Sequence, residues 1–159
     1  ESKSPFLSKR VAPTVNRQFM SSKNWLIKLR SQGYRLTDAR RAVVETIAQS
    51  PRALTPADVY DLAKEQYPAL GLVTVYRTLE KLEELHLVQR VHQDQGCNAY
   101  LAHAEGHQHL LICQKCKKAV YFEGDDLNDF FSEVGKKHNF VVKEHWLQLF
   151  GVCKDCQRG

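Results

Sequence analysis

The chain has 159 residues, of which 43% are hydrophobic and 26% are charged. This composition is typical of a folded globular protein and excludes a disordered or fibrous one. No stretch approaches the roughly 18 apolar residues that a membrane-spanning helix needs, and the N-terminus lacks the apolar core of a signal peptide, so we expect a cytoplasmic protein. Residues 1–20 are basic and show no hydrophobic period, and we treat them as a leader or extension outside the fold.

The net charge of +5 favours an anionic partner, and its placement along the chain is more informative than its size. Arginines concentrate in the first half, whereas acidic residues cluster in the second. This asymmetry predicts a nucleic-acid-binding half and a separate half with another task. The arginines are Arg30, Arg35, Arg40, Arg41, Arg52, Arg77 and Arg90, and the acids are Asp125, Asp126, Asp129 and Glu133.

The first half begins with three short segments in which apolar residues recur at helical spacing. The first covers residues 21–31. The second is capped by Thr37 or Asp38 and stops at Ser50. The third covers residues 55–66 and opens with Thr-Pro-Ala-Asp, which supplies an N-cap, a proline at the first helical position and an acid at N3.

A fourth helical segment, residues 73–85, is amphipathic in a way that predicts DNA recognition. One face is apolar, and the other carries Thr74, Tyr76 and Arg77. Short helices that end in one with a polar and basic free face fit a helix-turn-helix, whose final helix enters the major groove.

Two short strands are predicted after this helix, at residues 87–93 and 98–102, with a turn at 94–96. Such a hairpin would be the wing of a winged helix. The alternative for residues 21–102 is a small helical bundle whose surface arginines are merely solvated, and periodicity alone does not separate the two interpretations.

The second half alternates strands with one helix. The expected elements are strands at 109–113 and 119–123, a helix at 125–138, and a strand or strand pair at 140–152. We therefore predict an α+β protein with a winged helix-turn-helix domain at 21–102 and an α/β domain at 103–159.

The cysteines predict a structural zinc site. Four of the five form two Cys-x-x-Cys pairs in a chain without a secretion signal, which favours metal ligation over disulfides. Four thiolates fill a tetrahedral site and leave no position for water. The alternative is four unmetallated core cysteines. The pairs are Cys113 with Cys116 and Cys153 with Cys156.

Histidines near the first cysteine pair predict a second, weaker site. His107 and His109 would lie on one side of a strand, and His103 and His145 are further candidates. Nitrogen and oxygen ligands suit divalent zinc, iron or manganese and bind them more reversibly than four thiolates, which is what a sensor needs.

The remaining reactive side chains give no sign of catalysis. No metalloprotease, serine-hydrolase, nucleotide-binding or deaminase motif is present, so we expect no enzyme. His86 and His138 are interpreted as surface residues. His92 and Cys97 flank the predicted turn, where sensor ligation, redox reactivity and no role at all remain open.

Together these motifs resemble the ferric uptake regulator (Fur) family over residues 23–157. The resemblance implies homodimeric repressors that bind AT-rich palindromic DNA when a divalent metal fills a regulatory site, and it makes the second half a dimerisation domain. The motifs are RLTDAR at 35–40, TVYRTL at 74–79, HQHLLICQKC at 107–116 and HWLQLFGVCKDC at 145–156.

The resemblance also assigns residues on the DNA side. Tyr76 and Arg77 match positions that contact bases and backbone, and Arg35 matches a basic residue that reaches the minor groove. The full set that we expect to contact DNA is Arg35, Arg40, Thr74, Tyr76, Arg77 and Arg90.

On the metal side, the resemblance makes the four cysteines the structural zinc ligands. His107, His109 and His145 match a regulatory site in which the family usually has a glutamate at the position of Asn128. The fourth ligand could then be Asp125, Asp129 or water.

A second family site at the hinge between the domains is altered or absent. Its usual ligands are replaced by Gln108, Leu110 and Tyr121, although a small shift in register would let His109 serve the hinge. His103 stands where zinc-sensing members often have a cysteine, and Leu101 stands where iron sensors have an acid, which favours zinc over iron. Manganese is expected to substitute in vitro.

Two alternatives remain. A peroxide-sensing member of the same family would use carboxylate-bound iron. A zinc-stabilised adaptor would bind an acidic protein through its basic half, with little dependence on salt.

Overall fold

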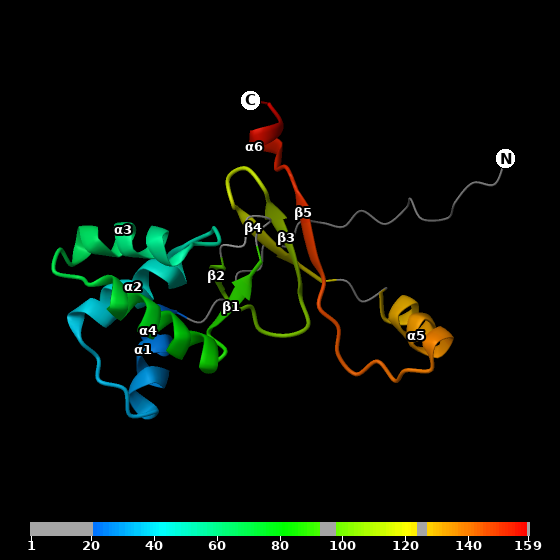
Figure 1. Ribbon diagram of the computed structural model, residues 1–159, viewed down its shortest axis with the longest axis horizontal. Coiled ribbons are helices and arrows are strands. Elements are labelled where there is room, and N and C mark those ends of the chain that lie inside the picture. Colours follow the sequence, from blue (N-terminus) through cyan, green and yellow to red (C-terminus); the bar gives the residue numbers. More distant parts are fainter. Residues whose placement is uncertain (1–20, 93–97, 124–126, 159) are drawn as a thin grey trace.

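A computed structural model describes residues 21–92, 98–123 and 127–158 of the chain. The predicted extension at 1–20, the turn at 94–96, Cys97 and Asp125 lie outside these ranges. Helices α1 to α4 gather at one end of the molecule, two small sheets occupy the middle, and α5 lies at the other end (Figure 1). Within the described ranges, no helix has the length and apolar character needed to cross a membrane.

Four helices form where helical spacing predicted them, and the second and third begin at the predicted cap residues. Thr37 accepts a hydrogen bond from the backbone of Arg40, and Thr55 forms a reciprocal capping box with Asp58. The helices are α1 (Ser22–Ser31), α2 (Asp38–Gln49), α3 (Pro56–Gln66) and α4 (Leu72–Glu84).

The end of α1 depends on glycine. Gly33 has a φ of 82°, a conformation that side chains disfavour. It donates to the Arg30 carbonyl, and Tyr34 donates to the Leu29 carbonyl, which together make a Schellman motif. The chain therefore turns sharply into α2.

The four helices enclose the first core. Their buried faces include Trp25, Leu29, Val43, Val75 and Leu79. The apolar face predicted for the fourth helix packs into this core, and Leu85, just after the helix, is partly buried against it.

The predicted hairpin is present beside this core. Strand β1 (Val88–Val91) pairs antiparallel with β2 (Ala99–Ala102), with Val88 opposite Ala102. Together with the helices, this hairpin gives the winged-helix arrangement.

The second sheet has the strand order β4-β3-β5. Strand β3 (His109–Cys113) pairs antiparallel with β4 (Ala119–Phe122) and parallel with β5 (Gln148–Gly151). Helix α5 (Leu127–His138) connects β4 to β5, and the short α6 (Lys154–Gln157) ends the described chain.

The predicted strand at 140–152 is wrong in its first part, since only Gln148–Gly151 is a strand. The chain leaves α5 through Asn139, whose φ is 60°, and the Phe140 amide donates back to the Gly135 carbonyl. Val141 is 84% exposed and has no neighbouring strand among the described residues. Without a partner for its backbone, this segment runs as an extended connection.

Residues 51–54 join the two halves of the molecule. Leu54 exchanges two backbone hydrogen bonds with Tyr100 of β2, and on the other side Ala53 donates to the Lys117 carbonyl while Ala119 donates to the Pro51 carbonyl. A second core lies over this junction. It consists of Ala53, Val91, Ala99, Leu101, Leu110 and Ile112.

The capping box predicts a stability effect. The change Thr55→Ala should lower the free energy of unfolding by about 1 kcal/mol, because the Asp58 amide loses its acceptor at the start of α3. Urea unfolding followed by circular dichroism and by the fluorescence of buried Trp25 measures this. Thr55→Ser, which keeps the hydroxyl, should unfold close to the unaltered chain, and equal losses for both changes would contradict the assignment.

Candidate metal centres and DNA-binding surface

The four predicted cysteines meet because β3 and β5 are parallel neighbours. Cys113 ends β3 opposite Gly151 of β5, and Cys153 follows directly beyond that strand. Cys116 lies in the turn after β3, and Cys156 lies in α6. Their sulfur atoms all lie within 4.8 Å of one another.

This geometry fits a tetrahedral zinc ion. Zinc bonds to sulfur at about 2.3 Å, so two thiolates on one tetrahedral ion stand about 3.8 Å apart. The sulfur atoms of Cys116 and Cys153 are 3.7 Å apart. No rearrangement of this pair is needed to receive the ion.

Backbone groups prepare one of the thiols for ligation. The backbone N–H groups of Cys116 and Cys153 lower the pKa of the Cys113 thiol to about 6. A cysteine must be a thiolate to bind zinc, so this ligand is favoured in its binding form at neutral pH.

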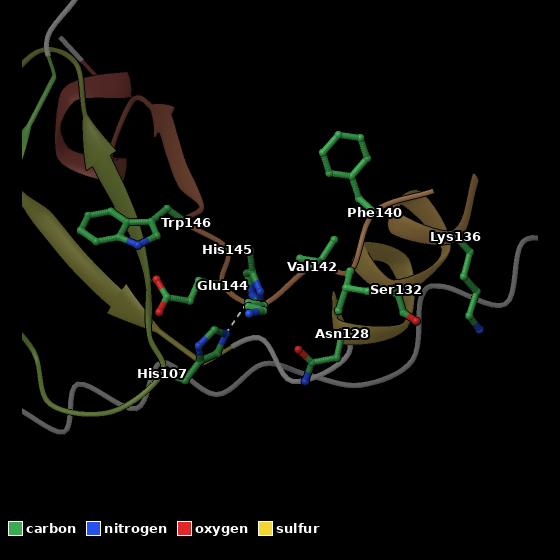
Figure 2. A pocket seen from close by; sticks show the side chains of 11 residues that line it. His107, Asn128, Ser132, Lys136, Phe140, Val142, Glu144, His145 and Trp146 are labelled. Atoms are coloured by element: carbon green, nitrogen blue, oxygen red, sulfur yellow. Dashed lines mark hydrogen bonds between the residues drawn. The ribbon is translucent and has the colours of Figure 1, made fainter. Parts of the chain in front are cut away.

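The predicted histidines form the second cluster. His109 opens β3, His107 precedes it, and His145 lies just before β5. Their ligand nitrogens lie within 4.8 Å of one another, and the Nε2 atoms of His107 and His145 are 2.9 Å apart (Figure 2). Three imidazoles from two segments therefore converge on one point.

The environment of this cluster suits a divalent cation. The Nε2 atom of His109 is buried without a hydrogen-bond partner among the described residues, which is costly unless something binds it. Burial lowers the pKa of His145, and His107 and His109 lower it further, so its imidazole is favoured in the neutral, metal-binding form. Phe131 of α5 stacks on His145 with ring centroids 4.1 Å apart.

A cavity of about 710 Å³ opens beside the histidines, between α5 and the connection to β5 (Figure 2). Asn128 lines it together with His107 and His145, so its side chain faces the same space. Asp129 lies exposed in the first turn of α5, outside the histidine cluster. The cluster is open on this side, in contrast to the four thiols.

His103 is separate from the three histidines. It is not one of the converging ligands, although it lines a neighbouring cavity of about 140 Å³ with His107 and His145. Burial lowers its pKa. His92 is exposed after β1, and the structure gives it no metal-binding neighbours among the described residues.

The exposed face of α4 carries the predicted DNA-contacting residues. Val75 and Leu79 point into the first core, which leaves Thr74, Tyr76 and Arg77 on the other side. Tyr76 is 48% exposed and Arg77 is exposed. Arg35, also exposed, lies in the segment between α1 and α2.

Two of the predicted contacts are held within the chain. Arg40 donates to the Arg35 carbonyl, and Arg90 makes a two-bond ion pair with Glu83, with distances of 3.1 and 2.6 Å. Arg90 also lies over the Tyr100 ring. Their guanidinium groups therefore make contacts within the winged-helix half, which also contains Arg35 and α4.

Sequence reasoning missed Phe131 and the hydrogen-bonding role of Tyr121. The helical spacing of Phe131 gave no sign that it would stack on a histidine of a distant segment. The sequence identifies Tyr121 only as a residue that replaces a ligand. In the structure its hydroxyl accepts a hydrogen bond from the Gln89 amide and donates one to the Ala102 carbonyl.

Comparison with known proteins agrees with this geometry. The sequence profile of the ferric uptake regulator family matches residues 31–150. The ferric uptake regulation protein of Bacillus subtilis is 36% identical over 133 residues, covering 81% of this chain and 89% of that protein. The peroxide-responsive repressor PerR of Staphylococcus aureus is 26% identical over 132 residues, covering 83% and 88%.

Solved structures share the fold. The Helicobacter pylori ferric uptake regulator superposes with a TM-score of 0.69 at 22% identity, covering 87% of this chain and 95% of that one. The Vibrio cholerae regulator gives a TM-score of 0.63 at 26% identity, with coverages of 80% and 98%. The profile match and the identity to the Bacillus subtilis protein lead to one assignment: this chain belongs to the ferric uptake regulator family.

Proposed function

We propose that this chain is a metal-responsive DNA-binding repressor that controls metal uptake genes. Residues 21–102 would bind DNA, and residues 103–159 would dimerise and bind metal. The observation that carries the proposal is the pairing of a closed four-thiol cluster with an open three-histidine cluster on one sheet, joined to a winged-helix head.

The four thiols would hold a structural zinc ion. Sulfur fills every position of a tetrahedral ion, so Cys113, Cys116, Cys153 and Cys156 leave no place for a substrate or exchangeable water. The ion would fix the ends of β3 and β5 in a region with a small core.

The three histidines would hold the regulatory ion. Neutral imidazoles on one tetrahedral zinc ion stand about 3.4 Å apart, so the rings of His107 and His145 must part by only about 0.5 Å to admit one. Asn128 or water from the adjoining cavity would complete the site. Asp125 and His103 remain further candidates for it.

Zinc is our preferred regulatory ion, because the converging set is made of nitrogen ligands without a described carboxylate. Iron is the second choice: relatives at up to 36% identity are ferric uptake regulation proteins. A peroxide sensor is less supported, since the carboxylates expected around its iron are not among the converging side chains of the described ranges.

A second copy of the chain would cover the apolar surface of the second half. Phe140, Val141 and Trp146 are each more than 70% exposed there. Exposed apolar area of this kind marks an interface. A two-fold dimer would present two α4 helices to successive major grooves of a palindromic, AT-rich site.

The central test measures DNA binding against metal. Protein stripped of its weakly bound metal is titrated with zinc, ferrous iron and manganese, and fluorescence anisotropy follows an AT-rich palindromic duplex. We expect one ion per chain to resist stripping and a second to raise DNA affinity by about 5- to 150-fold, the usual range of such coupling. DNA affinity that ignores added metal would rule out the sensor.

Removing one histidine should abolish this gain. His145→Ala takes away a converging ligand and should leave DNA affinity at the metal-free level, with one metal ion fewer per chain. His138→Ala, at the exposed end of α5, is the matched control and should respond to metal normally. Anisotropy and metal analysis are run on both variants, and a normal response from His145→Ala would remove this residue from the site.

The exposed face of α4 predicts two distinct losses. Arg77→Ala should reduce the slope of log affinity against log salt by about one, as expected for a lost phosphate contact. Tyr76→Ala should weaken binding to the specific duplex by about tenfold, the effect of losing one base contact. Arg30→Ala, an exposed arginine of α1, is the control. A protein-binding adaptor would show none of these changes.

The four-thiol cluster predicts a zinc-dependent stability. Cys113→Ser should lose the ion that resists stripping, because only three thiolates remain, and the β4-β3-β5 sheet should unfold at lower urea. Zinc content by mass spectrometry and urea unfolding measure this. Cys97→Ser, which changes the cysteine that belongs to neither Cys-x-x-Cys pair, should retain the zinc, and equal zinc loss from both variants would contradict the assignment.

A further inference from the structure

A chain of hydrogen bonds crosses from the wing to the C-terminal sheet. The Gln89 side-chain amide of β1 donates to the Tyr121 hydroxyl of β4 at 3.0 Å, and that hydroxyl donates to the Ala102 carbonyl at the end of β2 at 2.6 Å. We call these three residues the strut. Through it, one side chain of the metal-binding half contacts both strands of the wing.

The strut is partly buried. Tyr121 packs against the second core, which is shared by the two halves. Burial raises the pKa of Tyr121, so its hydroxyl keeps the proton that it donates to Ala102. A partly buried hydroxyl that donates and accepts at once has a restricted geometry, and breaking either bond costs free energy.

Both ends of the strut lie next to the histidine cluster. On β4, Tyr121 precedes Phe122, which pairs with His109 across the sheet and has its ring 5.5 Å from the His109 ring. At the other end, the short segment after Ala102 leads directly to His107. Gln89 and Tyr121 also line the cavity of about 140 Å³ that His107 and His145 border.

An ion at the histidines would therefore act on both ends of the strut. The Nε2 atoms of His107 and His145 would part from 2.9 Å to about 3.4 Å, the spacing on a tetrahedral zinc ion, and His109 would be the third ligand. Movement of His107 would reach the segment that follows Ala102, and movement of His109 would reach the β4 edge that carries Tyr121. The wing would be displaced with them only while the hydrogen bonds connect the two halves.

We propose that Tyr121 is a positioning residue that connects the wing to the C-terminal sheet. Through this connection, metal binding at the histidine cluster changes the position of the DNA-binding half. The inference rests on the proposed function and extends it by naming the connection between the two sites. Gln89 is its partner on the wing.

The test uses the full chain with Tyr121→Phe, which keeps the ring and removes the hydroxyl. DNA affinity is measured by anisotropy with and without zinc, after metal analysis shows that both sites still load. Without zinc the variant should match the unaltered chain. With zinc it should bind DNA about fivefold more weakly, because the hydroxyl no longer joins Gln89 and Ala102 to the C-terminal sheet. Gln89→Met should reproduce this result, and it provides a second variant if the first does not fold.

Tyr67→Phe is the matched control, since it removes a hydroxyl from a partly buried tyrosine that belongs to the first core instead of the strut. It should keep the full response to zinc. Equal weakening of Tyr121→Phe with and without zinc would show a purely structural role and overturn the proposal, as would an unchanged response to zinc.

A second readout does not depend on DNA. Hydrogen exchange of Val88–Val91 should slow when zinc is added to the unaltered chain and to Tyr67→Phe, and should slow less in Tyr121→Phe and Gln89→Met. If zinc leaves DNA affinity unchanged in the unaltered chain, the proposed function fails. Hydrogen exchange still tests the role of Tyr121 in that case. Equal slowing of exchange in all four proteins would overturn the proposal.

Discussion

The convergence of four thiols at one end of the β4-β3-β5 sheet is the constraint on which the second half of the molecule depends. This half buries few large side chains: Leu110 and Ile112 belong to a core completed by residues of the wing and of segment 51–54. A core of this size gives little stability by itself, and small domains commonly need a metal to supplement it. An ion that joined Cys113 and Cys153 would fix the parallel pairing of β3 and β5.

The same pairing creates the histidine cluster. His109 begins the strand that Cys113 ends, and His145 lies before the strand that Cys153 follows. An ion at one end of β3 and β5 would therefore help to hold the two imidazoles together at the other end. The two clusters differ in chemistry in the way that the proposed tasks require. Four sulfurs would close a site, whereas three nitrogens beside a cavity would leave a bound ion able to exchange.

Two arginines of the DNA-binding half form hydrogen bonds and an ion pair within that half. Arg90 joins α4 to the wing through Glu83, and Arg40 holds the turn that carries Arg35. Arg35 and the α4 residues Tyr76 and Arg77 stay exposed, which is why we propose that they contact DNA. The head then meets the sheet through segment 51–54 and through Tyr121, which provides a route between metal and DNA.

The sequence by itself determined the local elements and the ligand types. Helical spacing and the caps at Thr37 and Thr55 predicted the four helices because these signals act within one turn. The cysteine pairs predicted the thiol cluster because each pair chelates from a single tight turn. The family-specific motifs agreed with both.

Only the tertiary structure decided which distant segments meet. Segment 140–146 has no strand partner among the described residues, Phe131 stacks on His145, and Tyr121 contacts Gln89 of the wing. Each of these facts depends on contacts between residues far apart in the chain, and such contacts are fixed by packing rather than by local preference. The sequence could name Tyr121 as a departure from the family, but its hydrogen bonds follow from the fold.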